Sequence, residues 1–133
     1  MKNKYFVTKH TVSFIRYHFV FCPRYRRKIF SISGVEERFK KITEDICAKN
    51  GIELLDMACN SDSVHIFLAC TPMWSPHDVM KIIKRASTIV LREEFPALSS
   101  ISSLWTRSFF VSTAENISDA EIQRYVDTQK KRS

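Results

Sequence analysis

The segment 63–70, SVHIFLAC, has the clearest strand pattern in the sequence. With the period of two of a β-strand, one side is wholly apolar and the other carries a serine and a histidine. The apolar side consists of Val64, Ile66, Leu68 and Cys70, and the other side of Ser63, His65, Phe67 and Ala69. The run IELLDMAC (52–59) precedes it, and Asn60-Ser61-Asp62 separates the two runs as a turn. The pattern predicts a β-hairpin with one buried face and His65 on the other, open face.

Two amphipathic helices are expected on either side of this hairpin. In the segment 33–51, apolar residues recur at helical spacing and Asn50-Gly51 supplies the C-terminal stop. The segment 75–96 begins with Ser75 as the N-cap and Pro76 at the first helical position, and it ends at Pro96.

Strands are also expected near both ends of the chain. The run HTVSFIRYHFVFC (10–22) predicts a long central strand, because apolar residues occur on both of its faces, and Pro23 ends it. The run LWTRSFFVST (104–113) predicts a fourth strand. A last helix is expected over 118–131, starting with a capping box made by Ser118 and Glu121.

The resulting order is β-α-β-β-α-β followed by an extra helix. This order is typical of the α+β class with a ferredoxin-like, or RRM-like, fold: an antiparallel sheet with two helices on one face. The extra helix is expected near an edge of the sheet or reaching toward a neighbouring chain.

Length and charge limit the classes of function. A chain of 133 residues with 44% hydrophobic residues is expected to form one domain, 1–133. Its formal net charge of +7 favours a polyanionic partner such as nucleic acid, although a merely basic soluble protein carries the same charge. No apolar run approaches the roughly 20 residues that cross a bilayer, so no membrane partner is expected. Four cysteines without zinc-like spacing and the lack of a signal peptide favour the cytoplasm.

Three groups of residues could carry chemistry. His65 is a single histidine on a strand, which is more often structural than a ligand. Tyr125 and Gln129 lie one turn apart on the last predicted helix and share a face, but such pairs are common on protein surfaces. The basic stripe on the segment 81–92 is, by itself, typical of a solvated helix face. From spacing alone, none of these groups identifies a function.

Four stretches, taken together, resemble the single-tyrosine HUH transposases of the smallest bacterial insertion sequences. They are YHFVFCPRYRRKIF (17–30), DSVHIFLACTP (62–72), LWTRSFFVSTAENIS (104–118) and IQRYVDTQ (122–129). They occur in the order and spacing of that family and cover nearly the whole chain. The fold of the family is also the one predicted above from the pattern of elements.

The resemblance implies a transposase of single-stranded DNA that recognises subterminal hairpins and cuts beside them. Tyr125 would be the nucleophile and would form a 5′-phosphotyrosine, and a released 3′-OH would later attack such a linkage. The implied cofactor is Mg²⁺ or Mn²⁺, held by a His-hydrophobic-His pair and by Gln129, with no small-molecule cofactor. The implied assembly is a homodimer in which strands merge into one sheet, and the long first strand is a candidate for that edge.

This sequence departs from the family at the metal site. The family pattern Asp-His-hydrophobic-His reads Asp62-Ser63-Val64-His65 here, so a serine occupies the first ligand position. A neutral hydroxyl is a poorer donor than imidazole, although Mg²⁺ and Mn²⁺ accept oxygen and water ligands. Three interpretations stay open: a catalytically dead copy, a weakly active copy with a water in the gap, or an engineered variant. Impaired catalysis is the favoured one.

Contacts with DNA are expected from basic residues after the first strand and on the second helix. The candidates for phosphate contacts are Arg24, Arg26, Arg27, Lys28, Lys84 and Arg85. Tyr25 or Phe110 would stack on an extruded base. The main alternative is a catalytically inactive, domesticated regulator that binds DNA or RNA hairpins. A general RNA-binding domain of related topology is a third hypothesis, but the aromatic strand signature of that class is missing.

Overall fold

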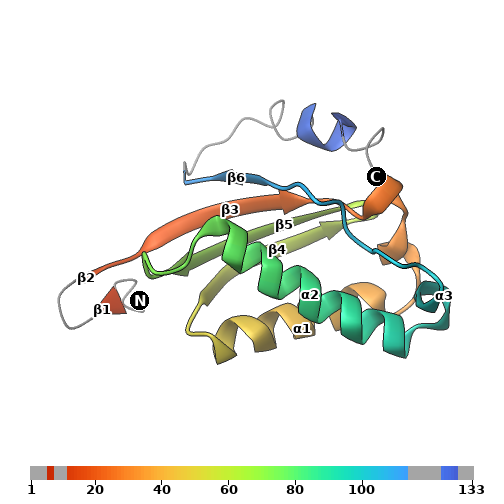
Figure 1. The fold of residues 1–133 in the computed structure, drawn as a ribbon, viewed down its shortest axis with the longest axis horizontal. Helices are drawn as coiled ribbons and strands as arrows, with labels where there is room; N and C mark the ends of the chain where they lie inside the picture. Colours follow the sequence, from red (N-terminus) through yellow and green to blue (C-terminus); the bar gives the residue numbers. More distant parts are fainter. Residues whose placement is uncertain (1–5, 8–11, 114–123, 129–133) are drawn as a thin grey trace.

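A computed structural model of the chain describes residues 6–7, 12–113 and 124–128. Its elements, in chain order, are β1 (Phe6–Val7), β2 (Val12–Ser13), β3 (Ile15–Phe21), the 3-10 turns η1 (Arg24–Arg26) and η2 (Ile29–Ser31), α1 (Val35–Lys49), β4 (Glu53–Asn60), β5 (Ser63–Cys70), α2 (Pro76–Glu94), α3 (Pro96–Ser99) and β6 (Phe110–Ser112). A helical segment at 124–128 follows. The main sheet has four strands in the order β4-β5-β3-β6, and every neighbouring pair is antiparallel (Figure 1). This confirms the predicted ferredoxin-like α+β fold.

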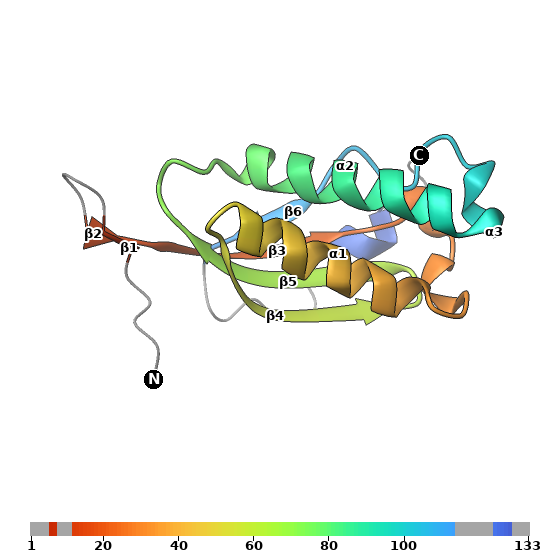
Figure 2. The same cartoon turned by 90° about the horizontal axis from the view of Figure 1, so that it is seen from below.

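The two long helices cover one face of the sheet, and the segment 124–128 lies over the other face (Figures 1 and 2). The main core lies between the sheet and α1 and α2. Its fully buried side chains include Phe19, Phe21, Phe39, Ile66, Leu68 and Leu91. A second, smaller cluster on the opposite face contains Val20, Cys22 and Val126, with Phe110 and Tyr125 packed against it. The face expected to be open is therefore partly covered by the C-terminal segment.

The hairpin and the second helix form as the sequence predicts. Asn60, predicted in the turn, is instead the last residue of β4 and pairs with Ser63, so the turn consists of Ser61 and Asp62 only. The Ser75 hydroxyl accepts a hydrogen bond from the Asp78 backbone N–H at 3.1 Å, which confirms the N-cap of α2. Helix α1 is followed by Gly51 with a φ of 69°, a backbone conformation that favours glycine after a helix.

The first strand differs from the prediction in two ways. The segment 10–22 is divided into β2 and β3, and β2 pairs with β1 in a separate two-stranded sheet that extends away from the main one (Figures 1 and 2). Strand β3 lies between β5 and β6, so it is central as predicted. The edges of the main sheet are β4 and β6, and β6 pairs with His18, Phe19 and Val20 of β3; that the first strand offers a dimerisation edge stays a prediction.

The fourth strand is shorter than predicted. Only Phe110–Ser112 pair with β3, although the sequence pattern extended over 104–113. Before β6, the chain runs beside Pro23 through a single bridge at Trp105, with hydrogen bonds from Arg24 N–H to the Leu104 carbonyl (2.7 Å) and from Thr106 N–H to the Cys22 carbonyl (3.1 Å). Because Pro23 has no N–H, a regular ladder cannot continue there.

Two further expectations are tested only within the described residues. Of the predicted last helix, only residues 124–128 are described; they are helical, while Ser118, Glu121 and Gln129 lie outside the described residues. No helix in the described part of the chain is long and apolar enough to cross a membrane.

Candidate active site

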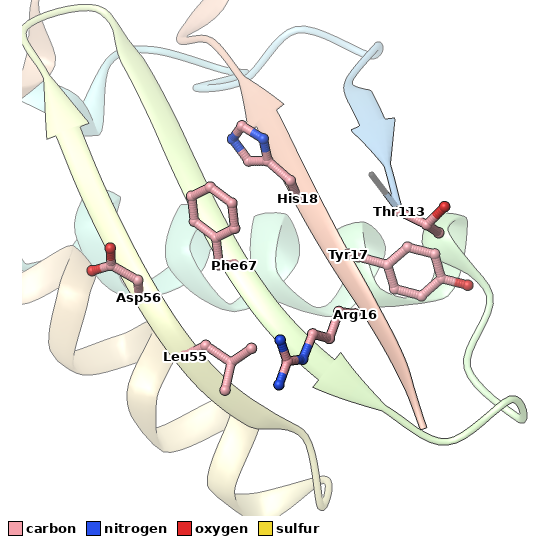
Figure 3. A pocket seen from close by; sticks show the side chains of 7 residues that line it. All are labelled: Arg16, Tyr17, His18, Leu55, Asp56, Phe67 and Thr113. Atoms are coloured by element: carbon pink, nitrogen blue, oxygen red, sulfur yellow. The ribbon is translucent and has the colours of Figure 1, made fainter. Parts of the chain in front are cut away.

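Two imidazoles from neighbouring strands meet on the sheet face opposite α1 and α2. The Nε2 atom of His18 on β3 lies 3.3 Å from the Nδ1 atom of His65 on β5. The His18 side chain is 5% exposed and stacks on Phe67, with ring centroids 4.1 Å apart and planes at 12° (Figure 3). His65 was expected on this face, whereas His18 was missed. Its position two residues after Arg16, on the same side of a strand, is the signal that could have found it.

The environment of His18 favours the neutral imidazole. Burial is the main cause that lowers the pKa of His18 from its usual value, and the neighbouring His65 lowers it further. A neutral imidazole is also the form that binds a metal ion. His18 borders a cavity of about 390 Å³ that Arg16, Asp56 and Thr113 also line, whereas His65 does not line it (Figure 3).

Ser63 lies two residues before His65 on β5, on the same side of the strand. Its side chain is buried, 3% exposed, and its hydroxyl accepts a hydrogen bond from Asn60 Nδ2 at 3.1 Å. Within residues 6–7, 12–113 and 124–128, no group of three or more His, Cys, Asp or Glu side chains is arranged to hold a metal ion. The donors nearest to the expected site are therefore two imidazoles and a hydroxyl.

Tyr125 reaches the same face of the sheet through the segment 124–128. Val126 is 6% exposed and packs with Val20 and Cys22, and Tyr125 packs against this cluster. Val20 is the cross-strand partner of His65, so the phenol and the imidazole lie on one face around the same β3 residue. The Tyr125 hydroxyl is 3.2 Å from the Ser108 hydroxyl. Gln129, the other residue expected on this helix, is outside the described residues.

An arginine connects three parts of the site. Arg26 donates from Nε and Nη2 to one carboxylate oxygen of Asp62, at 3.0 and 2.7 Å, and its Nη1 lies 3.7 Å from Asp127. It therefore joins η1, the β4–β5 turn and the segment that carries Tyr125. Arg26 was expected to contact DNA phosphates, but in this structure its guanidinium is engaged with carboxylates of the protein.

Lys84 also has protein partners instead of an open position. Its Nζ donates to the carbonyls of Thr106 and Ser108, at 2.8 and 3.0 Å, and lies over the rings of Phe21 and Phe109. Burial lowers the pKa of Lys84 to about 8. Of the two candidates on α2, only Arg85 is exposed. Through these two hydrogen bonds, Lys84 links α2 to the segment before β6.

Arg24, Tyr25 and Arg27 line a polar groove of about 440 Å³ together with Ser100, Ile101, Ser102 and Ser103. Tyr25 is 56% exposed, and the Arg27 guanidinium lies over its ring at 5.1 Å. The Arg24 Nε is buried and has no hydrogen-bond partner in the described part of the chain. Tyr25 has a φ of 60°, a conformation in which aromatic residues are uncommon, and it directs the backbone so that the ring faces solvent. Lys28 is exposed beside this groove.

The cysteines do not take part in the site. Cys22, Cys47, Cys59 and Cys70 are free, as expected, and burial raises the pKa of each thiol, for example to about 12 for Cys47. Such thiols are poor nucleophiles and poor metal ligands at neutral pH.

Comparisons with known proteins identify the family of this chain. The family described as "Transposase IS200 like" matches residues 11–129. The ISDra2 transposase TnpA of Deinococcus radiodurans is 31% identical over 118 residues, which are 86% of this chain and 84% of that protein. The transposase for insertion sequence element IS200 of Salmonella typhimurium is 31% identical over 124 residues, which are 90% of this chain and 80% of that protein.

Solved structures give the same result. A crystal structure of a transposase from Deinococcus radiodurans has a TM-score of 0.85 and 30% identity, and the match covers 93% of this chain and 97% of that one. A REP-associated tyrosine transposase bound to a REP hairpin has a TM-score of 0.59 and 11% identity, covers 91% of this chain and 69% of that one, and is similar in fold. Because the family match covers most of the sequence and relatives above 30% identity are matched nearly end to end, this chain belongs to the IS200-like transposase family.

Proposed function

We propose that this protein cuts and rejoins single-stranded DNA beside hairpins, with Tyr125 as the nucleophile. The observation that carries the proposal is the placement of Tyr125 and His65 on one face of the sheet, around Val20. A phosphate placed between a phenol and an imidazole-bound ion is the arrangement that covalent phosphoryl transfer needs. Membership of a transposase family supports strand transfer as the reaction class.

The covalent step uses the Tyr125 hydroxyl. Its oxygen forms a bond to phosphorus and loses its proton, while the bond between phosphorus and the 3′ oxygen breaks and that oxygen leaves as a 3′-OH. The Ser108 hydroxyl, 3.2 Å away, holds the phenol in position. A 3′-OH of another strand then attacks the phosphotyrosine, the phenolate leaves and recovers a proton, and no external energy is needed, since one phosphodiester replaces another.

The implied cofactor is Mg²⁺ or Mn²⁺ near His65, with Gln129 and the hydroxyl of Ser63 as further donors. When bound, a divalent ion would offset the negative charge that develops at the scissile phosphate. With serine at the position where the family has histidine, we expect slower cleavage than in a protein with both histidines, because a neutral hydroxyl binds these ions more weakly.

DNA binding is proposed for the groove at Arg24, Tyr25 and Arg27. The buried, unpartnered Arg24 Nε and the exposed ring of Tyr25 support this site, because a phosphate and a stacked base would satisfy them. Lys28 and Arg85, both exposed, would extend the phosphate contacts. Arg26 and Lys84 have carboxylate and carbonyl partners, so we assign them to support of the site. The structure of a related fold bound to a REP hairpin makes a hairpin the first ligand to test.

We also propose that the protein acts as a homodimer, as the family resemblance implies. The edge strands β4 and β6 are the positions where a second sheet could join, because β5 is paired on both sides and β3 pairs with β5 and, over His18, Phe19 and Val20, with β6.

The activity is tested with an oligonucleotide that carries a hairpin near its cleavage site, incubated with the protein and Mn²⁺ and analysed on a denaturing gel. A covalent protein–DNA adduct is expected, stronger for Ser63→His. The adduct should disappear in Tyr125→Phe and persist in Tyr17→Phe, in which another half-buried tyrosine loses its hydroxyl. Absence of an adduct in both the wild type and Ser63→His would overturn the proposal.

A second candidate is a domesticated regulator that binds hairpins without cutting them. The serine at position 63 favours it, since the basic groove is independent of the metal site. It predicts hairpin binding that is unchanged by chelator and by Tyr125→Phe. Metal-dependent cleavage by the wild-type protein would exclude it.

A further inference from the structure

We propose that His18 and His65 together form the metal-binding pair of this chain, so that an imidazole from β3 supplies the ligand that Ser63 does not. The inference deepens the proposed function, since it rests on a divalent ion acting at this face. The family resemblance implies a histidine pair at positions 63 and 65 of one strand, whereas the pair proposed here comes from β3 and β5.

The distance between the two nitrogens fits a shared ion. Two ligand nitrogens at about 2.1 Å from one ion lie about 3.0 Å apart in octahedral geometry and about 3.4 Å apart in tetrahedral geometry. The observed distance from His18 Nε2 to His65 Nδ1 is 3.3 Å. Small rotations of the rings would therefore direct both lone pairs at one position, without any shift of the strands.

The surroundings hold His18 ready for this role. Its ring is fixed by stacking on Phe67, and its cross-strand partners are Phe67 on β5 and Ser112 on β6. Because the side chain is already ordered, little conformational entropy would be lost when an ion binds. A cavity of about 390 Å³ borders His18, so an ion and its water ligands can approach this ring of the pair from solvent.

The remaining coordination positions suit catalysis. Within the described part of the chain no third His, Cys, Asp or Glu joins the pair at this point, so water and phosphate oxygens would share the remaining positions with the further donors proposed above. A site with open positions is typical of catalytic metals, whereas structural sites are closed by protein ligands. Two neutral imidazoles also predict a preference for Mn²⁺, Co²⁺ or Zn²⁺ over Mg²⁺.

The competing explanation is a plain hydrogen bond, in which one imidazole donates its N–H to the other. Both arrangements use the same pair of nitrogens, so ion binding has to be measured directly. The test is titration of the metal-free, full-length protein with Co²⁺, followed by calorimetry and by the visible absorption of the bound ion, in the absence of DNA.

Three histidine variants are compared with the wild type in this titration. His18→Gln and His65→Gln should each weaken Co²⁺ binding at least tenfold. The matched control is His77→Gln, because His77 is an exposed histidine at the start of α2 and should not affect binding. Ser63→His should strengthen binding. If His18→Gln binds Co²⁺ as tightly as the wild type while His65→Gln does not, the proposal is wrong.

A second measurement keeps the test valid if His18→Gln fails to fold, because it uses the wild-type protein only. Addition of Zn²⁺ should shift the ring nitrogen NMR signals of both His18 and His65 and leave those of His77 unchanged. Shifts confined to His65 would overturn the proposal. Loss of the covalent DNA adduct alone, with Co²⁺ binding intact, would instead overturn the transposase chemistry and leave the metal pair in place.

Discussion

Arg26 places two guanidinium hydrogens on a single carboxylate oxygen of Asp62, and both side chains are less than one-fifth exposed. The pair joins the turn after β3 to the turn between β4 and β5. With Asp127 3.7 Å away, it also connects the sheet to the segment of the tyrosine. The segment that carries Tyr125, the proposed nucleophile, therefore has a contact with the sheet outside the proposed reacting groups.

Replacing Asp62 by asparagine should lower the free energy of unfolding by about 1–2 kcal/mol, because a partly buried guanidinium loses its carboxylate. The matched control is Glu94→Gln, which breaks the more exposed pair with Arg38 and should lower the free energy of unfolding less than Asp62→Asn does. Urea unfolding of both variants measures the difference. Equal losses of unfolding free energy in the two variants would show that the Arg26–Asp62 pair stabilises the fold no more than the exposed pair does.

Hydrogen bonding in the core predicts a second effect. Trp105 donates its indole N–H to the Ser87 hydroxyl at 3.0 Å, and both side chains are buried. In Ser87→Ala, the indole N–H would be left without a partner, so we expect a loss of about 1–3 kcal/mol in unfolding free energy. The control is Ser31→Ala, which removes an exposed hydroxyl bonded to the Lys28 carbonyl. A loss no larger than that of the control would contradict this reading of the core.

Lys84 predicts a dependence of stability on pH. Because burial lowers its pKa from 10.5 to about 8, the unfolded chain binds more protons than the folded one between these values. Stability should therefore rise with pH in that window, by at most about 1.4 kcal/mol per pH unit. Lys84→Met lacks this contribution and provides the reference in urea unfolding at several pH values. A difference between wild type and variant that falls with pH would refute the assignment.

The groove at Arg24, Tyr25 and Arg27 predicts a change in salt dependence. Arg27→Ala should weaken hairpin binding and reduce the slope of log affinity against log salt by about 0.7–0.9, as expected for one lost phosphate contact. Lys41→Ala, which removes an exposed cation on α1 that pairs with Asp45, should leave the slope unchanged. Fluorescence anisotropy at several salt concentrations measures both. An unchanged slope in Arg27→Ala would show that Arg27 makes no contact with a DNA phosphate.

The sequence predicted the parts of the fold that local rules determine. The hairpin ending at Cys70 and the start of α2 at Ser75 follow from alternation, turn residues and capping. The segment 104–109 could not be predicted in the same way. This segment accepts hydrogen bonds from the Lys84 side chain and the Arg24 N–H, and it donates one to the Cys22 carbonyl. These partners are distant in the sequence.

Contacts between residues distant in the sequence also explain why only part of the candidate site was predicted. His65 was predicted to lie on the open face because the other face of its strand is wholly apolar, so the polar residues of the strand all lie on one side. His18 was missed because the predicted strand 10–22 has apolar residues on both faces, which drew attention away from the alternation of Arg16 and His18 on one of them. Only the register between β3 and β5, a tertiary feature, brings the two rings together.

The anchoring of the tyrosine segment has a consequence for subunit exchange. Of residues 124–128, only Val126 is buried, and burial of one valine contributes roughly 1.5–3 kcal/mol. The hydroxyl contact of Tyr125 and the solvent-facing carboxylate of Asp127 add about 1 kcal/mol each or less. If the protein forms the homodimer proposed above, an equivalent surface on the second copy would offer this segment the same contacts. In the proposed homodimer, such an exchange would let either subunit supply the proposed nucleophile to a given pocket.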